Sequence, residues 1–168
     1  MRTEDRIKTD QIVLDKLAER GVTIREIAEL VIFTQERHTD GLTIEACESN
    51  VLSVLRKREV QNAVMTGIQL DELADKKLLC EPLQTMVETD MGMYGIDEIL
   101  ALSIVNVYGS IAITNFGYLD VLKPEGVMKK LNQDKSQCNC FLDDIVAAIA
   151  AAAASRIVHN GEFAKKKP

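Results

Sequence analysis

Residues 141–157 read FLDDIVAAIAAAAASRI, in which two adjacent acids stand before a run dominated by alanine, isoleucine and valine. The run is rich in alanine, the best helix former, so the sequence predicts a helix here. A membrane-spanning helix needs about 20 apolar residues. This shorter run is therefore better explained as a buried helix of a bundle, and its small side chains would allow close packing within the chain or between copies.

Most of the remaining sequence also has helical patterns. Apolar residues recur at helical spacing from Asp5 to Arg20, and Gly21 is a typical residue just past a helix end. Thr23 and Glu26 have the spacing of a capping box, which predicts a helix that continues to residues 35–37. Further helices are predicted from Thr43 to about Thr66, over 69–79 and over 83–90, with loops at 91–95, 122–126 and 132–139 and a nearly continuous apolar stretch at 99–114.

These patterns predict an all-α fold, a single-domain multi-helix bundle with buried apolar C-terminal helices. The 168 residues suffice for one domain with a substantial core, and a hydrophobic fraction of 46% argues against disorder. We divide this single domain, residues 1–168, into N-terminal helices (1–90), a core that carries the acids (91–158) and a flexible tail (159–168).

The composition argues against a nucleic-acid partner. The net charge is −6, aromatic residues make up 4% and there is no tryptophan, whereas nucleic-acid-binding domains show basic patches and stacking aromatics. The one dense basic run, residues 165–167, is expected to be a solvated terminus.

The cysteines and the N-terminal sequence favour a cytoplasmic protein. Residues 1–9 are charged rather than apolar, so no signal peptide is expected. Without export, the four cysteines are expected to remain free thiols. The Cys138-Asn139-Cys140 pair lacks the further Cys or His residues that a zinc site of about four ligands needs, so we expect ordinary small side chains there.

Two pairs of acids at the start of apolar stretches are the strongest chemical signal in the sequence. Asp97-Glu98 precedes one stretch and Asp143-Asp144 the other, with Asp120 between them. Carboxylates are costly to bury unless they are paired, hydrogen-bonded or bound to a metal, and their oxygens suit Mg²⁺, with Mn²⁺ as the alternative.

Neighbouring residues on a helix point about 100° apart, so one acid of each pair can face a site while the other supports it. Asp97 and Asp144 are the first candidates for metal ligands, with Glu98 and Asp143 completing the metal set and Asp120 beside them. The alternative needs no metal, because Asp97 and Asp143 could cap their helices or interact with the helix dipoles.

Three segments carry a resemblance to a known family. DEILA at 97–101, FGYLDVLKP at 116–124 and LDDIVAA at 142–148 occur in the order and rough spacing of motifs in phosphatidylglycerophosphatase A and its soluble relatives, the low-temperature-requirement C proteins. The resemblance covers about residues 96–157. It implies a Mg²⁺-dependent hydrolase of phospholipid metabolism, which removes the terminal phosphate of phosphatidylglycerophosphate to give phosphatidylglycerol. The acids that match the family motifs, and are implied to be catalytic, are Asp97, Glu98, Asp120, Asp143 and Asp144.

The sequence also departs from the membrane enzymes of this family. They carry an arginine where this chain has Gly117 and a glycine where it has Ala148. Their Gly/Pro-rich N-terminal motif has no counterpart in residues 1–90, and their transmembrane helices are polar or shortened here. A metal site with a changed substrate or a changed relation to the membrane would fit these departures.

Two polar residues near the acids are candidates for substrate contacts. Lys123 could bind phosphate, or it could be a solvated lysine before Pro124. Asn115 could orient phosphate or water, or it could satisfy backbone groups. The expected partners are a phosphate ester, most simply a lipid headgroup, and further copies of the chain, with peripheral membrane contact and no transmembrane span.

Three other functions fit parts of the sequence. A phosphatase for a soluble phosphate ester would avoid the repulsion between an acidic protein and an anionic membrane. A helical nucleotide pyrophosphohydrolase would use Glu-x-x-Glu pairs, but Glu45 and Glu48 have no partner pair. A non-catalytic helical oligomer or stress-response binding module would fit the departures from the membrane enzymes of the family. A test for metal-dependent turnover would distinguish this function from the enzymatic ones.

Overall fold

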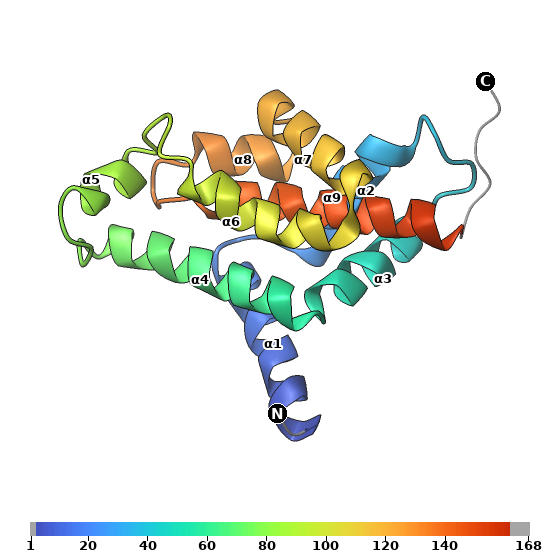
Figure 1. Ribbon diagram of the computed structural model, residues 1–168, viewed down its shortest axis with the longest axis horizontal. Coiled ribbons are helices and arrows are strands. Elements are labelled where there is room, and N and C mark those ends of the chain that lie inside the picture. Colours follow the sequence, from blue (N-terminus) through green and yellow to red (C-terminus); the bar gives the residue numbers. More distant parts are fainter. Residues whose placement is uncertain (1–2, 162–168) are drawn as a thin grey trace.

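The computed structural model describes the backbone of residues 3–161 and the side chains of residues 9–161. Within this range the chain is all-α, as predicted (Figure 1). Residues 162–168, most of the predicted tail, lie outside it. The elements are α1 (Thr3–Glu19), α2 (Ile24–Gln35), α3 (Ile44–Leu55), α4 (Arg58–Asp75), α5 (Leu83–Glu88), α6 (Ile96–Val105), the 3₁₀ helix η1 (Asn106–Tyr108), α7 (Ser110–Leu122), α8 (Val127–Gln133) and α9 (Leu142–Asn160).

Helix α9 is the centre of the bundle. It contacts α2, α3, α4, α6, α7 and α8, and Figure 1 shows it running through the middle of the molecule. Every side chain from Leu142 to Ser155 is buried, which is typical of a helix that is apolar on all sides and enclosed by others. The alanine run therefore packs within the chain rather than against another copy. No helix in the described part of the chain has the length and apolar character needed to cross a membrane.

The capping box predicted at the start of α2 is confirmed. The Thr23 hydroxyl accepts a hydrogen bond from the Glu26 N–H at 3.2 Å, and the Thr23 N–H donates to Glu26 Oε2 at 2.8 Å. The two bonds satisfy donors that a helix start leaves unpaired, so the sequence alone fixes where α2 begins.

The prediction of one continuous helix from Thr43 to Thr66 is wrong. It is divided into α3 and α4, and α4 continues to Asp75 through most of the segment predicted as a separate helix at 69–79. The break lies at Lys57, which is extended with φ −79° and ψ 132°, although no glycine or proline is nearby. The division lets α3 pack on α2 and α9 while α4 packs on α1, α6 and α9, so tertiary packing overrides local helix propensity.

Two further boundaries differ from the prediction. The apolar stretch 99–114 is divided between α6 and α7 at Gly109, whose φ of 80° lies in the region that favours glycine. Residues 127–133 form the short helix α8, which reaches into the predicted loop at 132–139 and buries Val127, Met128 and Leu131. The reversal at Gly109 turns α7 back along the bundle and brings its C-terminal end towards the starts of α6 and α9.

Gly67 is required where α4 crosses α9. A Cβ atom there would collide with Ile145 Cδ1 and lie 3.0 Å from Phe141 Cβ, and both residues are fully buried. We expect Gly67→Ala to lower the free energy of unfolding by about 1–3 kcal/mol, although alanine favours helices. The matched control is Gly117→Ala on α7, where a Cβ would meet nothing within 4 Å and a gain of about 0.5–1 kcal/mol is expected. Urea denaturation of both variants measures the contrast, and equal effects would show that the crossing is not tightly packed.

Candidate functional site

The five predicted acids converge on one cavity. Asp97 and Glu98 lie in the first turn of α6, Asp120 in the last turn of α7, and Asp143 and Asp144 in the first turn of α9. Together with Lys123 they line a cavity of about 200 Å³, which we call the acid pocket. The remaining lining residues are Asp90, Met91, Gly92, Met93 and Cys140.

Three of these acids are arranged as a set of metal ligands would be. Asp97, Glu98 and Asp144 each offer a carboxylate oxygen, and the three oxygens lie within 4.8 Å of one another. Asp97 and Asp144 are buried, and Glu98 Oε2 is buried without a hydrogen-bond partner among the described residues. Oxygen ligands, negative charge and an unsatisfied buried oxygen all fit a hard divalent cation such as Mg²⁺.

The acids raise one another's pKa values. A hydrogen bond with Asp97, burial and the charges of Asp97 and Asp120 raise the pKa of Glu98 to about 7. Burial, followed by the charges of Asp143 and Asp120, raises the pKa of Asp144 to about 9. Burial also raises the pKa of Asp143, although Lys123 opposes this shift. A cation in the pocket would relieve this repulsion, which is the pattern expected of a functional site rather than of a stabilising ion-pair network.

Lys123 points into the acid pocket rather than into solvent. Its Nζ lies 2.5 Å from Asp143 Oδ2, 3.1 Å from Asp120 Oδ1 and 3.9 Å from Asp144 Oδ1. Burial disfavours the charged amine, but Asp143 and Asp120 outweigh it and raise the pKa of Lys123, so the ammonium remains charged. Among the described residues it is the one cation that lines the pocket, where it neutralises part of the acid charge and can also contact a phosphate.

Helix capping does not explain the acid pairs. The N-cap positions of α6 and α9 are Gly95 and Phe141, and neither makes a side-chain capping bond. Asp97 Oδ1 accepts the N–H of Glu98 at 3.1 Å, and Asp143 Oδ1 accepts the N–H of Asp144 at 2.8 Å. Both helices direct their positive N-terminal ends at the pocket, where the dipoles favour carboxylates and would also favour a bound phosphate.

The start of α9 is instead capped by a residue that sequence reasoning missed. Asp71 of α4 is fully buried, and its two carboxylate oxygens accept the N–H groups of Phe141 and Leu142 at 3.1 and 3.0 Å. Burial raises its pKa to about 7, although these two backbone bonds act in the opposite direction. The acid lies 70 residues from its partners, so no local motif could have indicated that it positions Asp143 and Asp144.

Replacement of Asp71 should therefore affect both stability and the site. We expect Asp71→Ala to lower the free energy of unfolding by about 2–4 kcal/mol, because two buried N–H groups lose their acceptor, and to lower activity in the folded fraction. The control is Glu72→Gln, the next residue along α4, whose ion pair with Lys16 is partly exposed and should contribute about 1 kcal/mol or less. Chemical denaturation and activity assays at a temperature where both variants are folded would make the comparison, and equal losses would argue against the capping role.

Cys140 and Asp90 also belong to the pocket and were not predicted. The Cys140 thiol donates to Asp97 Oδ2 at 3.4 Å, and burial raises its pKa, which keeps it protonated. Asp90 follows α5, and one of its oxygens lies within 4.8 Å of a carboxylate oxygen of Asp97 and of the Cys140 sulfur. All four cysteines are free, as predicted. The C-x-C pattern was the one available signal, but it does not point to a carboxylate-rich pocket.

Asn115 is not brought to the acid pocket. It lies on α7, is partly buried and does not line the cavity, and its Nδ2 has no hydrogen-bond partner in the described part of the chain. Gly117, where the membrane enzymes have arginine, is exposed on the same helix, and Ala148 is fully buried in α9. Of the two predicted substrate contacts, the structure places only Lys123 among the acids.

Residues 14–159 match the phosphatidylglycerophosphatase A family. The chain belongs to this family. The three segments that carry the predicted resemblance all lie within the matched range, so the resemblance is confirmed. Membership of the phosphatidylglycerophosphatase A family suggests a phosphatase that acts on a phospholipid phosphate.

The similar proteins and solved structures cover most of the chain. The uncharacterized proteins YutG and YpjQ of Bacillus subtilis strain 168 are 59% and 57% identical, over 86% and 89% of this chain and 87% and 84% of their own lengths. The crystal structure of the low temperature requirement C protein from Listeria monocytogenes is 57% identical and has a TM-score of 0.88, covering 92% of this chain and 97% of that one. A Bacillus stearothermophilus protein is 56% identical with a TM-score of 0.87, over 90% of this chain and 94% of that one. The chain thus shares its fold with these solved structures at high sequence identity.

Proposed function

We propose that the chain is a Mg²⁺-dependent phosphatase that hydrolyses the terminal phosphate monoester of phosphatidylglycerophosphate to give phosphatidylglycerol. The observation that carries the proposal is the acid pocket, where acids from three helices meet one lysine beside two helix N-termini. Phosphoryl transfer needs little covalent chemistry from the protein, which must position the phosphate and neutralise its charge. Family membership supports the same reaction.

In this proposal Asp97, Glu98 and Asp144 hold the cation, which is Mg²⁺, with Mn²⁺ as the alternative, and Asp143 completes the ligand environment. The cation supplies positive charge for phosphate oxygens. Asp120 and Asp143 hold the Lys123 ammonium at the pocket, where it contacts the phosphate. The N–H groups at the starts of α6 and α9 contribute further positive potential. Together these groups orient the monoester and favour its dianionic terminal phosphate over the uncharged hydroxyl that replaces it in the product.

Exposed apolar side chains beside the pocket support a lipid headgroup as the substrate. Met93, which lines the pocket, is fully exposed, and Ile96 and Ile99 of α6 and Val121 and Leu122 of α7 are also exposed. Large apolar groups gathered on two neighbouring helices commonly mark a binding surface. We propose that this face touches the membrane peripherally while the headgroup phosphate enters the pocket.

We also propose a cytoplasmic setting. The free thiols support this setting. The same α6–α7 face could instead join copies into a homo-oligomer, because the alanine-rich helix is already buried within the chain. Light scattering with and without anionic vesicles would separate the two uses of this face.

The experiment that tests the function is phosphate release from phosphatidylglycerophosphate in mixed micelles, with Mg²⁺ or with chelator. Chelator-sensitive release is expected. Release from glycerol 3-phosphate in the absence of micelles, at an equal or greater kcat/KM, would instead favour a soluble phosphate ester, a candidate supported by the polar cavity beside the acid pocket. Absence of turnover on both substrates would reject the phosphatase and leave the non-catalytic binding module, which the glycine at position 117 would fit.

A further inference from the structure

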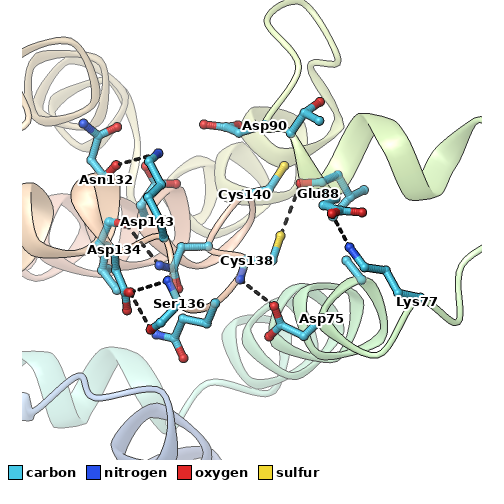
Figure 2. A pocket seen from close by; sticks show the side chains of 17 residues that line it. Asp75, Lys77, Glu88, Asp90, Asn132, Asp134, Ser136, Cys138, Cys140 and Asp143 are labelled. Carbon is cyan, nitrogen blue, oxygen red and sulfur yellow. Dashed lines mark hydrogen bonds and ion pairs between the residues drawn. The ribbon is translucent and has the colours of Figure 1, made fainter.

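A second cavity opens directly beside the acid pocket. This side cavity has a volume of about 350 Å³ and lies between residues 74–77, 87–90 and 131–140. Asp90, Cys140 and Asp143 line both it and the acid pocket, so the two spaces meet at these residues. In Figure 2, Asp90 lies beside Cys140 on one side of the side cavity, and Asn132, Asp134 and Ser136 lie across from it. A group attached to a phosphate in the acid pocket can therefore extend into this cavity.

The side cavity is polar, but most of its charged groups already have partners. Lys77 forms an ion pair with Glu88, Asp75 accepts the Cys138 N–H at 2.6 Å, and Asp134 accepts from the N–H and hydroxyl of Ser136 at 2.8 and 2.6 Å. These pairs fix the walls of the cavity and leave few charged groups free to bind a ligand.

Asp90 is the exception. Its backbone N–H bonds to the Val87 carbonyl, but its exposed carboxylate has no hydrogen-bond or ion-pair partner among the described residues. A carboxylate accepts hydrogen bonds and repels anions. Acids also outnumber lysines around the cavity, so a second phosphate would be disfavoured there. The chemistry matches a neutral group that donates hydrogen bonds, which is what an alcohol bearing further hydroxyl groups provides.

A third cavity offers the competing route out of the acid pocket. It has a volume of about 500 Å³, and its walls include Leu30, Phe33 and Leu122. It shares only Lys123 with the acid pocket, and the ammonium of Lys123 is held by Asp143 and Asp120. This cavity suits an apolar substituent, so the two routes predict opposite preferences between polyol and alkyl phosphates.

We propose that the side cavity is the subsite for the alcohol portion of the phosphate ester, and that Asp90 accepts a hydrogen bond from a hydroxyl near the ester oxygen. The inference rests on the proposed function, since it places the phosphate in the acid pocket. The ligand class is a polyol phosphate, either free in solution or as a lipid headgroup whose glycerol, with its one free hydroxyl, enters the side cavity while its phosphodiester stays outside. Because Asp90 lies where the two cavities meet, it recognises the hydroxyl groups closest to the bond that is cleaved.

The backbone at Asp90 allows a clean test. Its φ is 48°, in the left-handed region that glycine and asparagine adopt most easily. Asp90→Gly removes the carboxylate without adding backbone strain, and Asp90→Asn keeps one acceptor oxygen while removing the charge. The control for loss of one negative charge is Glu45→Gln, at an exposed position of α3 that lines neither cavity.

Two non-hydrolysable phosphonates serve as probes in calorimetric titrations with Mg²⁺. Dihydroxybutylphosphonate resembles glycerol 3-phosphate, and butylphosphonate lacks only its two hydroxyls. The unmodified protein and Glu45→Gln should bind the diol about tenfold more tightly than the alkyl compound. Asp90→Gly removes a negative charge that also lines the acid pocket and can shift both affinities, so the readout is their ratio, which should fall to about one. Asp90→Asn should retain part of the preference.

Several outcomes would overturn the subsite. They are equal affinity of the unmodified protein for the two phosphonates, tighter binding of butylphosphonate, an equal loss of both affinities in Asp90→Gly, and no binding of either compound. Phosphate release from phosphatidylglycerophosphate, measured separately, distinguishes the two proposals. Release without a diol preference rejects the subsite alone, whereas an Asp90-dependent diol preference without release rejects the proposed lipid reaction and supports the subsite for a free polyol phosphate.

Discussion

Asp144→Asn is expected to lower Mg²⁺-dependent phosphate release by about 10³-fold or more while making the metal-free protein more stable. The activity falls because an amide carries no charge for the cation that the acid cluster would hold. The stability rises because Asp144 is buried among Asp97, Asp120 and Asp143, and its ionised form is disfavoured there. Opposite effects on activity and stability are typical of a functional site, since a capping or ion-pairing acid would lose stability on the same substitution.

The same residue predicts how stability depends on pH. The pKa of Asp144 is about 9 in the folded protein, against an ordinary value of 3.8, so the folded state binds more protons than the unfolded state between these values. Stability of the metal-free protein should therefore fall as pH rises through this window, and Glu98, with a pKa of about 7, contributes in the same direction. Urea denaturation in chelator at pH 5 and pH 8 measures the slope.

Asp144→Asn should flatten that slope, whereas Asp15→Asn, at an exposed position of α1, should leave it unchanged. Added Mg²⁺ should restore stability at pH 8 in the unmodified protein and have little effect on Asp144→Asn. An Asp144→Asn protein that is less stable than the unmodified one, with an unchanged slope, would mean that this acid is structural.

Lys123→Met is expected to lower the free energy of unfolding of the metal-free protein by about 3–5 kcal/mol. Methionine keeps much of the stem of the side chain but removes the ammonium that pairs with Asp143 at 2.5 Å and Asp120 at 3.1 Å. Asp143 is buried, so the loss leaves an uncompensated charge in the first turn of the central helix. Mg²⁺ should recover part of the stability, because it supplies positive charge to the same acids.

The matched control is Lys129→Met, which removes an exposed ion pair with Glu125 and should cost about 1 kcal/mol or less. Urea denaturation of both variants and of the unmodified protein, with and without Mg²⁺, gives the losses to be compared. Equal losses in the two variants would show that Lys123 contributes no more than a surface lysine, and Asp143 would then need another source of compensation.

The features that could be predicted from the sequence are local. The alanine-rich run at 145–157 predicts a buried helix from its composition, and Thr23 and Glu26 predict the start of α2 from their spacing. The acids at the starts of α6 and α9 are recognisable as pairs, and the family motifs placed them in one site. Lys123 could be named as a candidate phosphate contact because it stands three residues after Asp120.

The features that could not be predicted depend on contacts between distant segments. Asp71 is an ordinary acid within a helix until α9 places two N–H groups beside it. Asp90 becomes part of the pocket through its nearness to Cys140 and Asp97. The break at Lys57 has no breaker residue nearby, because it arises from how α3 and α4 pack on different neighbours. The helical periodicity of apolar residues in the sequence does not indicate which distant segments will contact one another.

The central position of α9 also has a consequence for biosynthesis. Translation proceeds from the N-terminus, so the helix against which α2, α3, α4, α6, α7 and α8 pack is made after all of them. Until residues 142–160 emerge from the ribosome, the apolar faces of these helices have no common partner, and such exposed surface is prone to aggregation. The nascent chain should therefore remain protease-sensitive and dependent on chaperones until very late in synthesis, and should then become resistant in a single step once α9 docks.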